Sequence, residues 1–158
     1  MLKLYSRKLE ALGDTTLEPF IARLSDNSNL HYPLRKNEIL LLDDVSNSCG
    51  EPLPEGFSAY FFKNVAPKDL PKNLINSFVL GEELAYLSPG DVIKFDPKSK
   101  SVSVIYRKNS NSNSLLVTER CNNYCLMCSQ PPRDVDDGYL VNELLQAIPF
   151  FSKETKEI

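Results

Sequence analysis

The sequence predicts a fold of the α+β or α/β class, in which a β-rich N-terminal domain is followed by one strand, one loop and one helix. Short apolar runs with strand-like patterns fill residues 37–107, and a helical apolar pattern follows near residue 140. A polar, low-complexity run, NSNSNS, separates the two parts. We therefore expect a β-rich domain over residues 1–108, a linker over 109–114 and a second part over 115–158.

Four segments of the first part are expected to form strands. Residues 37–43 (NEILLLD) and 57–65 (FSAYFFKNV) are short runs rich in apolar and aromatic side chains. Residues 91–96 (DVIKFD) and 101–107 (SVSVIYR) are joined by a polar turn, and the second alternates apolar with polar side chains. This pattern is typical of a β-hairpin. Together the four segments predict a small, mostly antiparallel β domain.

The second part reads as a single βα unit. Residues 115–119 (LLVTE) form a short apolar, β-branched run that predicts a strand, and three cysteines follow it. Asp136 or Asp137 is expected to cap a helix. The expected apolar stripe of that helix consists of Leu140, Val141, Leu144, Leu145 and Ile148. The cysteines would then follow the carboxyl end of a strand, where parallel α/β folds place their chemistry.

Composition excludes several functional classes. The 158 residues contain 18 Lys and Arg against 21 Asp and Glu, a net charge of −3, without a basic stripe for nucleic acid or an anionic membrane. Charges interrupt the N-terminus where a signal peptide needs an apolar run. No stretch approaches the ~18 apolar residues of a membrane span. We therefore expect a cytoplasmic protein with neither a nucleic-acid nor a membrane partner.

Three of the four cysteines, Cys121, Cys125 and Cys128, lie within eight residues, an arrangement typical of metal or redox chemistry rather than of a disulfide framework. Their spacing would also fit one face of a helix, but two asparagines and two prolines in the same stretch disfavour that structure. A structural zinc site needs four ligands. The other candidate ligands, Cys49 and His31, lie in the other expected domain.

An iron–sulfur cluster suits this pattern better. Thiolates are the usual ligands of a cubane cluster, and one short loop is enough to surround it. Three protein ligands leave one iron open to a small chelating molecule. The spacing C-x3-C-x2-C is most specific when a strand precedes it and a helix follows, as expected here.

The segment Cys121-Asn-Asn-Tyr-Cys125-Leu-Met-Cys128 resembles the signature of radical S-adenosylmethionine enzymes. The resemblance implies that Cys121, Cys125 and Cys128 bind three irons of a [4Fe–4S] cluster. It also implies that S-adenosyl-L-methionine chelates the fourth iron, with Met127 near the adenine. Reductive cleavage of that cofactor would give a 5′-deoxyadenosyl radical, which abstracts hydrogen from the substrate.

The longer string TERCNNYCLMCSQPP, with the hairpin before it, resembles the HxsC-type radical maturases of the His-Xaa-Ser repeat system. This resemblance implies two partners, a peptide or small protein of the His-Xaa-Ser repeat type and an electron donor. An alternative interpretation is a non-catalytic β module that binds a peptide at a sheet edge and carries a metal-binding cysteine tail, with iron–sulfur or zinc.

The sequence departs from the radical enzyme family after the cysteines. The family fold is a partial barrel of repeated βα units with a Gly-Gly-Glu stretch after the second strand, and no such stretch follows Cys128. Residues 81–83 (Gly-Glu-Glu) lie upstream and read as a turn. We therefore expect the first βα unit of a truncated partial barrel, able to bind a cluster but forming little 5′-deoxyadenosine by itself.

Overall fold

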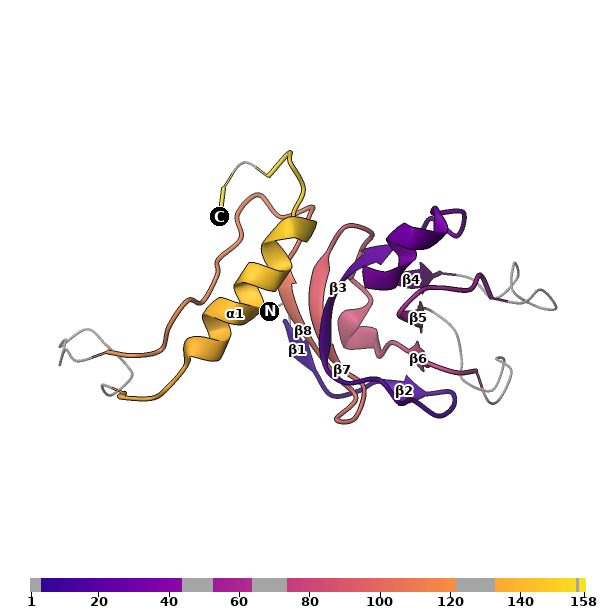
Figure 1. The fold of residues 1–158 in the computed structure, drawn as a ribbon, viewed down its shortest axis with the longest axis horizontal. Helices are drawn as coiled ribbons and strands as arrows, with labels where there is room; N and C mark the ends of the chain where they lie inside the picture. The colour runs from indigo at the N-terminus through magenta and orange to yellow at the C-terminus, as the bar shows by residue number, and fades with distance from the viewer. Residues whose placement is uncertain (1–3, 44–52, 64–73, 122–132, 156) are drawn as a thin grey trace.

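The computed structural model describes residues 4–43, 53–63, 74–121, 133–155 and 157–158. Within that part of the chain the fold is a strand-rich α+β structure with one α-helix, α1 (Gly138–Ala147) (Figure 1). The strands are β1 (Tyr5–Ser6), β2 (Glu10–Ala11), β3 (Phe20–Ser25), β4 (Glu38–Leu42), β5 (Ala59–Phe62), β6 (Ser77–Val79), β7 (Val92–Asp96) and β8 (Ser101–Tyr106). Three short 3-10 turns are η1 (Tyr32–Asn37), η3 (Glu82–Leu84) and η4 (Ile148–Phe150).

All eight strands belong to one sheet, in the order β1-β8-β7-β3-β4-β5-β6-β2. The pairings from β3 through β6 are parallel, and the other four are antiparallel. Strands β1 and β2 occupy the two opposite edges, although only residues 7–9 separate them in the chain. The sheet must therefore curl until its edges approach each other, but it is not closed.

The main hydrophobic core lies inside this curl. The rings of Phe61, Phe78 and Phe95 meet edge to face, with centroids 4.8 to 6.2 Å apart. Leu9, in the connection between the two sheet edges, packs into the same cluster. Edge-to-face aromatic packing adds to the stabilisation from apolar burial. The cluster also includes Ala22, Leu24, Ile39, Leu41, Ala59, Leu80, Leu84, Leu87, Ile93 and Val102.

Helix α1 and the chain after it pack on the outside of the sheet, beside β7 and β8 (Figure 1). Ala147 is fully buried against Val92 and Tyr106. The Phe151 ring stacks on the Tyr106 ring at a centroid distance of 4.4 Å. The tyrosine hydroxyl lies 2.6 Å from Thr155 Oγ1. The segment after the expected boundary thus shares a hydrophobic cluster with the sheet before it.

Several expected elements are confirmed. Strand β4 falls within residues 37–43, β5 within 57–65, and β7 and β8 form the expected antiparallel hairpin. The run at residues 81–83 contributes to a 3-10 turn, as the turn interpretation predicts. The sheet is more mixed than expected, because three of its seven pairings in the described residues are parallel.

The strand expected at residues 115–119 is wrong, because these residues have no strand structure. Leu116 and Val117 are more than half exposed, so no apolar surface holds the run extended in a sheet. Helix α1 forms where expected, but most of its apolar stripe is exposed, and Ala147 is its one buried residue. The first βα unit of a partial barrel is therefore not visible in the described residues.

Candidate metal centre

The structure describes one of the three predicted ligands. Cys121 is exposed and directly precedes residues 122–132, which are not described. Cys125, Cys128 and Met127 lie outside the described residues, as does Cys49. The local geometry of this candidate site is therefore defined by the residues on either side of the cysteine-containing segment.

The two ends of that segment lie side by side. The backbone N–H of Cys121 donates a hydrogen bond of 3.0 Å to the carbonyl oxygen of Arg133. We call residues 118–121 and 133–137 the cysteine neck. This bond joins the two halves of the neck, and Cys125 and Cys128 lie between those halves in the sequence.

Two ion pairs cross the neck. Arg133 Nη1 lies 2.9 Å from Glu119 Oε2, and Arg120 Nη2 lies 2.8 Å from Asp134 Oδ1. All four side chains are well exposed, and exposed pairs contribute about 0–1 kcal/mol each. Each arginine beside Cys121 is thus engaged by a carboxylate, so the pairs serve mainly to align the two halves of the neck.

Asp137 provides the buried part of the neck. Its carboxylate is 7% exposed, and its Oδ2 accepts hydrogen bonds from the Glu119 backbone N–H and, at 2.9 Å, from the Thr118 hydroxyl. These bonds lower the pKa of Asp137 below its usual value, and the bond from the Glu119 backbone has the largest effect. Asp137 occupies the N-cap position of α1, one of the two positions expected from the sequence, but its side chain makes no capping hydrogen bond. It ties the chain before Cys121 to the start of the helix.

The geometry of the described residues offers no fourth protein ligand near Cys121. No cluster of three or more His, Cys, Asp or Glu side chains suited to a metal occurs in those residues. His31 is exposed and directly precedes η1, which lies beside β4 at the opposite end of the molecule from the neck (Figure 1). A zinc site that combines His31 with Cys121 is therefore incompatible with this fold.

Two buried carboxylates outside the neck were not singled out by the sequence. Glu38 is 3% exposed and accepts a hydrogen bond of 2.9 Å from Arg23 Nε, and Asp91 is fully buried. Desolvation raises the pKa of both groups, against the opposing effects of their hydrogen bonds. The strand register that pairs Arg23 with Glu38 would have revealed the first contact, but the sequence did not predict β3.

Comparisons with known proteins found no relative of this chain. No protein-family model, no curated protein and no solved structure matches it. Among the described residues no helix is both long enough and apolar enough to cross a membrane.

Proposed function

We propose that this chain forms the cluster-binding part of a radical S-adenosylmethionine enzyme, with Cys121, Cys125 and Cys128 as ligands to three irons of a [4Fe–4S] cluster. The observation that supports the proposal is the bond between Cys121 and Arg133, because it joins the residues on either side of the sequence that contains the other two cysteines. A cubane cluster needs its thiolates within one compact region, and the close spacing of the three cysteines in the sequence suits that need.

The residues at the neck fit such a group. Cys121, the one ligand that the structure describes, is an exposed residue. Both neighbouring arginines are paired with carboxylates, and three deprotonated thiolates are the donor type that iron–sulfur clusters use. The exposed apolar side chains on both sides of the loop, Leu116, Val117, Val135 and Tyr139, offer covering surface for a bound cofactor.

When bound, the cluster supplies the electron that cleaves the carbon–sulfur bond of S-adenosyl-L-methionine. Asp137 and the Cys121–Arg133 bond would hold the two halves of the neck together beside the cluster. Met127 is proposed to lie against the adenine of the cofactor. The substrate is proposed to be a peptide or small protein of the His-Xaa-Ser repeat type, with a separate electron donor.

The alternative of a peptide-binding β module receives no support from the sheet edges. Peptide addition to a sheet requires an edge strand with unpaired backbone groups. Here the edge strands β1 and β2 have two residues each, so each edge offers few backbone groups to an added strand within the described residues. Any peptide recognition is therefore better sought at side-chain surfaces than by strand addition to β1 or β2.

Anaerobic reconstitution tests the proposal. We expect the purified chain to bind iron and sulfide in a near 1:1 ratio and to gain broad visible absorption, as thiolate-bound cubane clusters do. Cys121→Ala, Cys125→Ala and Cys128→Ala should each abolish that absorption, whereas Cys49→Ala, the matched control, should retain it. Stoichiometric zinc binding without iron uptake, or equal loss in the Cys49 variant, would overturn the assignment.

A further inference from the structure

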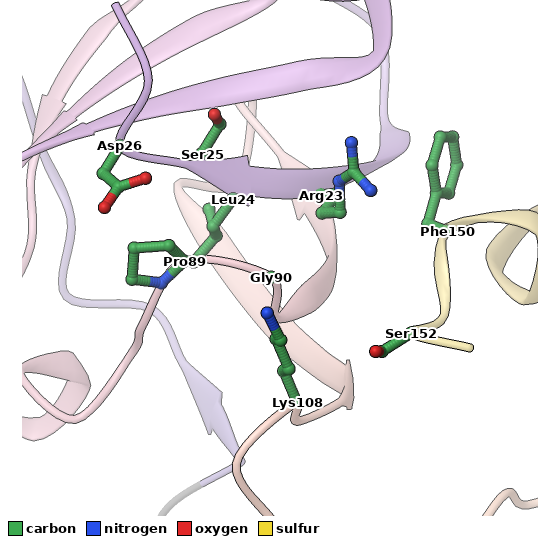
Figure 2. Close-up of a pocket in the computed structure, with 9 residues that line it drawn as sticks. All are labelled: Arg23, Leu24, Ser25, Asp26, Pro89, Gly90, Lys108, Phe150 and Ser152. Carbon is green, nitrogen blue, oxygen red and sulfur yellow. The ribbon is translucent and has the colours of Figure 1, made fainter. Parts of the chain in front are cut away.

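A polar cavity of about 260 Å³ lies beside Phe150 and Ser152, in the chain that follows α1 (Figure 2). It is formed by the end of β3, the turn before β7, the chain after β8, and the chain after α1. The neck is joined to the first turn of α1 and the cavity includes Phe150 and Ser152, so the ten residues of the helix, about 15 Å, separate them. This cavity is therefore distinct from the proposed cluster site.

Lys108 is placed in this cavity by its backbone and by a glycine. Its backbone N–H donates to Oδ1 of the buried Asp91 at 2.9 Å. Gly90 has φ +93, and a Cβ there would lie 2.5 Å from Lys108 Cδ. The lysine stem thus passes directly over Gly90, where no other residue type leaves room. The described residues include no ion-pair or hydrogen-bond partner for the Lys108 ammonium group.

Arg23 adds a second cation to the lining, and the buried carboxylate of Glu38 holds it in place. Its Nε donates to Glu38 Oε1 at 2.9 Å, and Nη2 of the guanidinium reaches the same oxygen. Glu38 is 3% exposed, while the arginine side chain is 42% exposed. The buried carboxylate therefore fixes the guanidinium and offsets its charge, and it leaves part of the Arg23 donor fork exposed beside the cavity.

A serine hydroxyl adds a donor to the same lining. Ser152 Oγ accepts a hydrogen bond of 3.2 Å from the Glu154 backbone N–H, so its hydroxyl hydrogen remains available for donation. The Ser25 hydroxyl lies on the other side of β3 from Lys108 (Figure 2). Figure 2 shows the Ser152 hydroxyl turned toward the side of the cavity where Lys108 lies.

Asp26 adds a negative charge to the lining, apart from the two cations. It is exposed, and in Figure 2 it lies beyond Pro89, at the far end of the cavity from Arg23 and Ser152. Glu38 offsets the charge of Arg23, and Asp26 adds a negative charge to the lining that already contains Lys108. A simple anion would therefore gain little net Coulomb attraction, whereas a molecule with both charges would match both ends.

We propose that this cavity binds a small zwitterion of the α-amino acid type. Its carboxylate would accept hydrogen bonds from Lys108, Arg23 and the Ser152 hydroxyl, and its ammonium group would lie toward Asp26. The volume is below the 300–1,000 Å³ usual for drug-sized ligands, which limits the occupant to a small molecule or to the end of a chain.

Titration with L-alanine, observed through the backbone amide signals of Gly90 and Lys108 by NMR, tests this inference. We expect saturable shifts with L-alanine. N-acetyl-L-alanine, which lacks the ammonium group, and L-alaninamide, which lacks the carboxylate, should each bind at least about tenfold more weakly. Inorganic phosphate provides the anion-only comparison and should also bind more weakly.

Matched variants separate the roles of Lys108 and Asp26. Lys108→Met keeps the stem over Gly90 but removes the charge, and should weaken L-alanine binding about tenfold. Lys108→Arg should restore most of it, and Lys36→Met, outside the cavity, should have no effect. Asp26→Asn should erase the preference for L-alanine over its N-acetyl form. Equal binding of the two forms by the unaltered protein, tighter binding of phosphate, or no saturable shift up to about 100 mM would overturn the proposal.

Discussion

The backbone N–H of Lys108 donates to Oδ1 of Asp91 at 2.9 Å, and this bond joins the end of β8 to the start of β7. The other carboxylate oxygen accepts the backbone N–H of Ser88 at 3.0 Å. The backbone of Asp91 also accepts a bond of 2.9 Å from the N–H of Leu24, in β3. One buried residue therefore connects three neighbouring segments of the sheet.

Replacing Asp91 with alanine is expected to lower the free energy of unfolding by about 3 kcal/mol, because the two backbone donors that its carboxylate satisfies would lose their buried acceptor. Urea denaturation followed by circular dichroism measures this change. Asp96→Ala is the matched control: Asp96 ends β7, the strand that Asp91 directly precedes, and its carboxylate accepts bonds at the exposed turn that follows. A loss in the control as large as in the Asp91 variant would contradict the special role of Asp91.

The pH dependence of stability should also report on Asp91. Burial raises its pKa above the ordinary value of 3.8, so the folded state holds the proton more tightly than the unfolded chain. Its contribution to stability should therefore fall as pH rises from near 3.8 to the raised pKa, and stay constant above it. In Asp91→Asn this fall should be missing from the curve of unfolding free energy against pH. Parallel curves for the two proteins across that range would contradict the shift.

Much of the sheet could be predicted from local pattern, because β4, β5, β7 and β8 carry short apolar or alternating runs that few other structures satisfy. Strands β1 and β2 have two residues each, too few for any periodicity. The parallel pairing of β3 with β4 depends on long-range packing that a single sequence does not display. The aromatic cluster of Phe61, Phe78 and Phe95 likewise joins three separate strands.

Less of the candidate site than of the sheet could be predicted from the sequence. The cysteine spacing is visible in the sequence, but the neck is not, because it depends on the hydrogen bonds of Asp137 with Thr118 and Glu119. Those bonds also explain the strand predicted wrongly at residues 115–119. One backbone donor at the end of the run bonds to a side chain instead of to a neighbouring strand, and the apolar side chains before it stay exposed.

Phe95 is expected to be the most sensitive position of the aromatic core. Its side chain is fully buried, and its ring lies 4.8 Å from Phe78 and 5.0 Å from Phe61. Phe95→Ala should cost about 3–5 kcal/mol of unfolding free energy, whereas Phe95→Leu should cost markedly less because most of the volume is kept. Chemical denaturation of both variants checks the order. Similar losses for alanine and leucine would show that ring geometry outweighs cavity volume here.

Asp137→Ala should open the cysteine neck without unfolding the sheet. The Glu119 N–H and Thr118 hydroxyl would lose their acceptor, so the amides of Glu119 and Cys121 should exchange with solvent faster than in the unaltered protein. Because the pKa of Asp137 is lowered, its bonds stabilise the neck above the ordinary value of 3.8 and are lost as pH falls through the lowered pKa.

Hydrogen exchange followed by NMR measures this effect, and Asp136→Ala is its matched control. Asp136 is an exposed neighbour whose carboxylate accepts a single weak bond from Gly138, at 3.4 Å. Under the proposed function, the Asp137 variant should also lose iron faster after reconstitution than the Asp136 variant. Unchanged exchange at both amides in Asp137→Ala would show that the two ion pairs alone are enough to close the neck.

The contact between Tyr106 and Phe151 should determine how firmly the chain after α1 is held on the sheet. The rings stack at 4.4 Å with an interplanar angle of 16°, and Tyr106 itself is 1% exposed. A double-mutant cycle with Tyr106→Leu and Phe151→Leu should give a coupling energy of about 0.5–1.5 kcal/mol, since stacked aromatic pairs contribute that much beyond burial.

A separate substitution isolates the hydroxyl of the same tyrosine. Tyr106→Phe keeps the stack and removes only the contact with Thr155, so it should cost about 1 kcal/mol. Thr155→Val should then cost nothing further in the Tyr106→Phe background.

A coupling energy near zero in the double-mutant cycle of Tyr106 and Phe151 would mean that the segment after residue 114 docks independently of β8, as two separate domains would. A clear coupling would mean that the helix and sheet unfold as one cooperative unit.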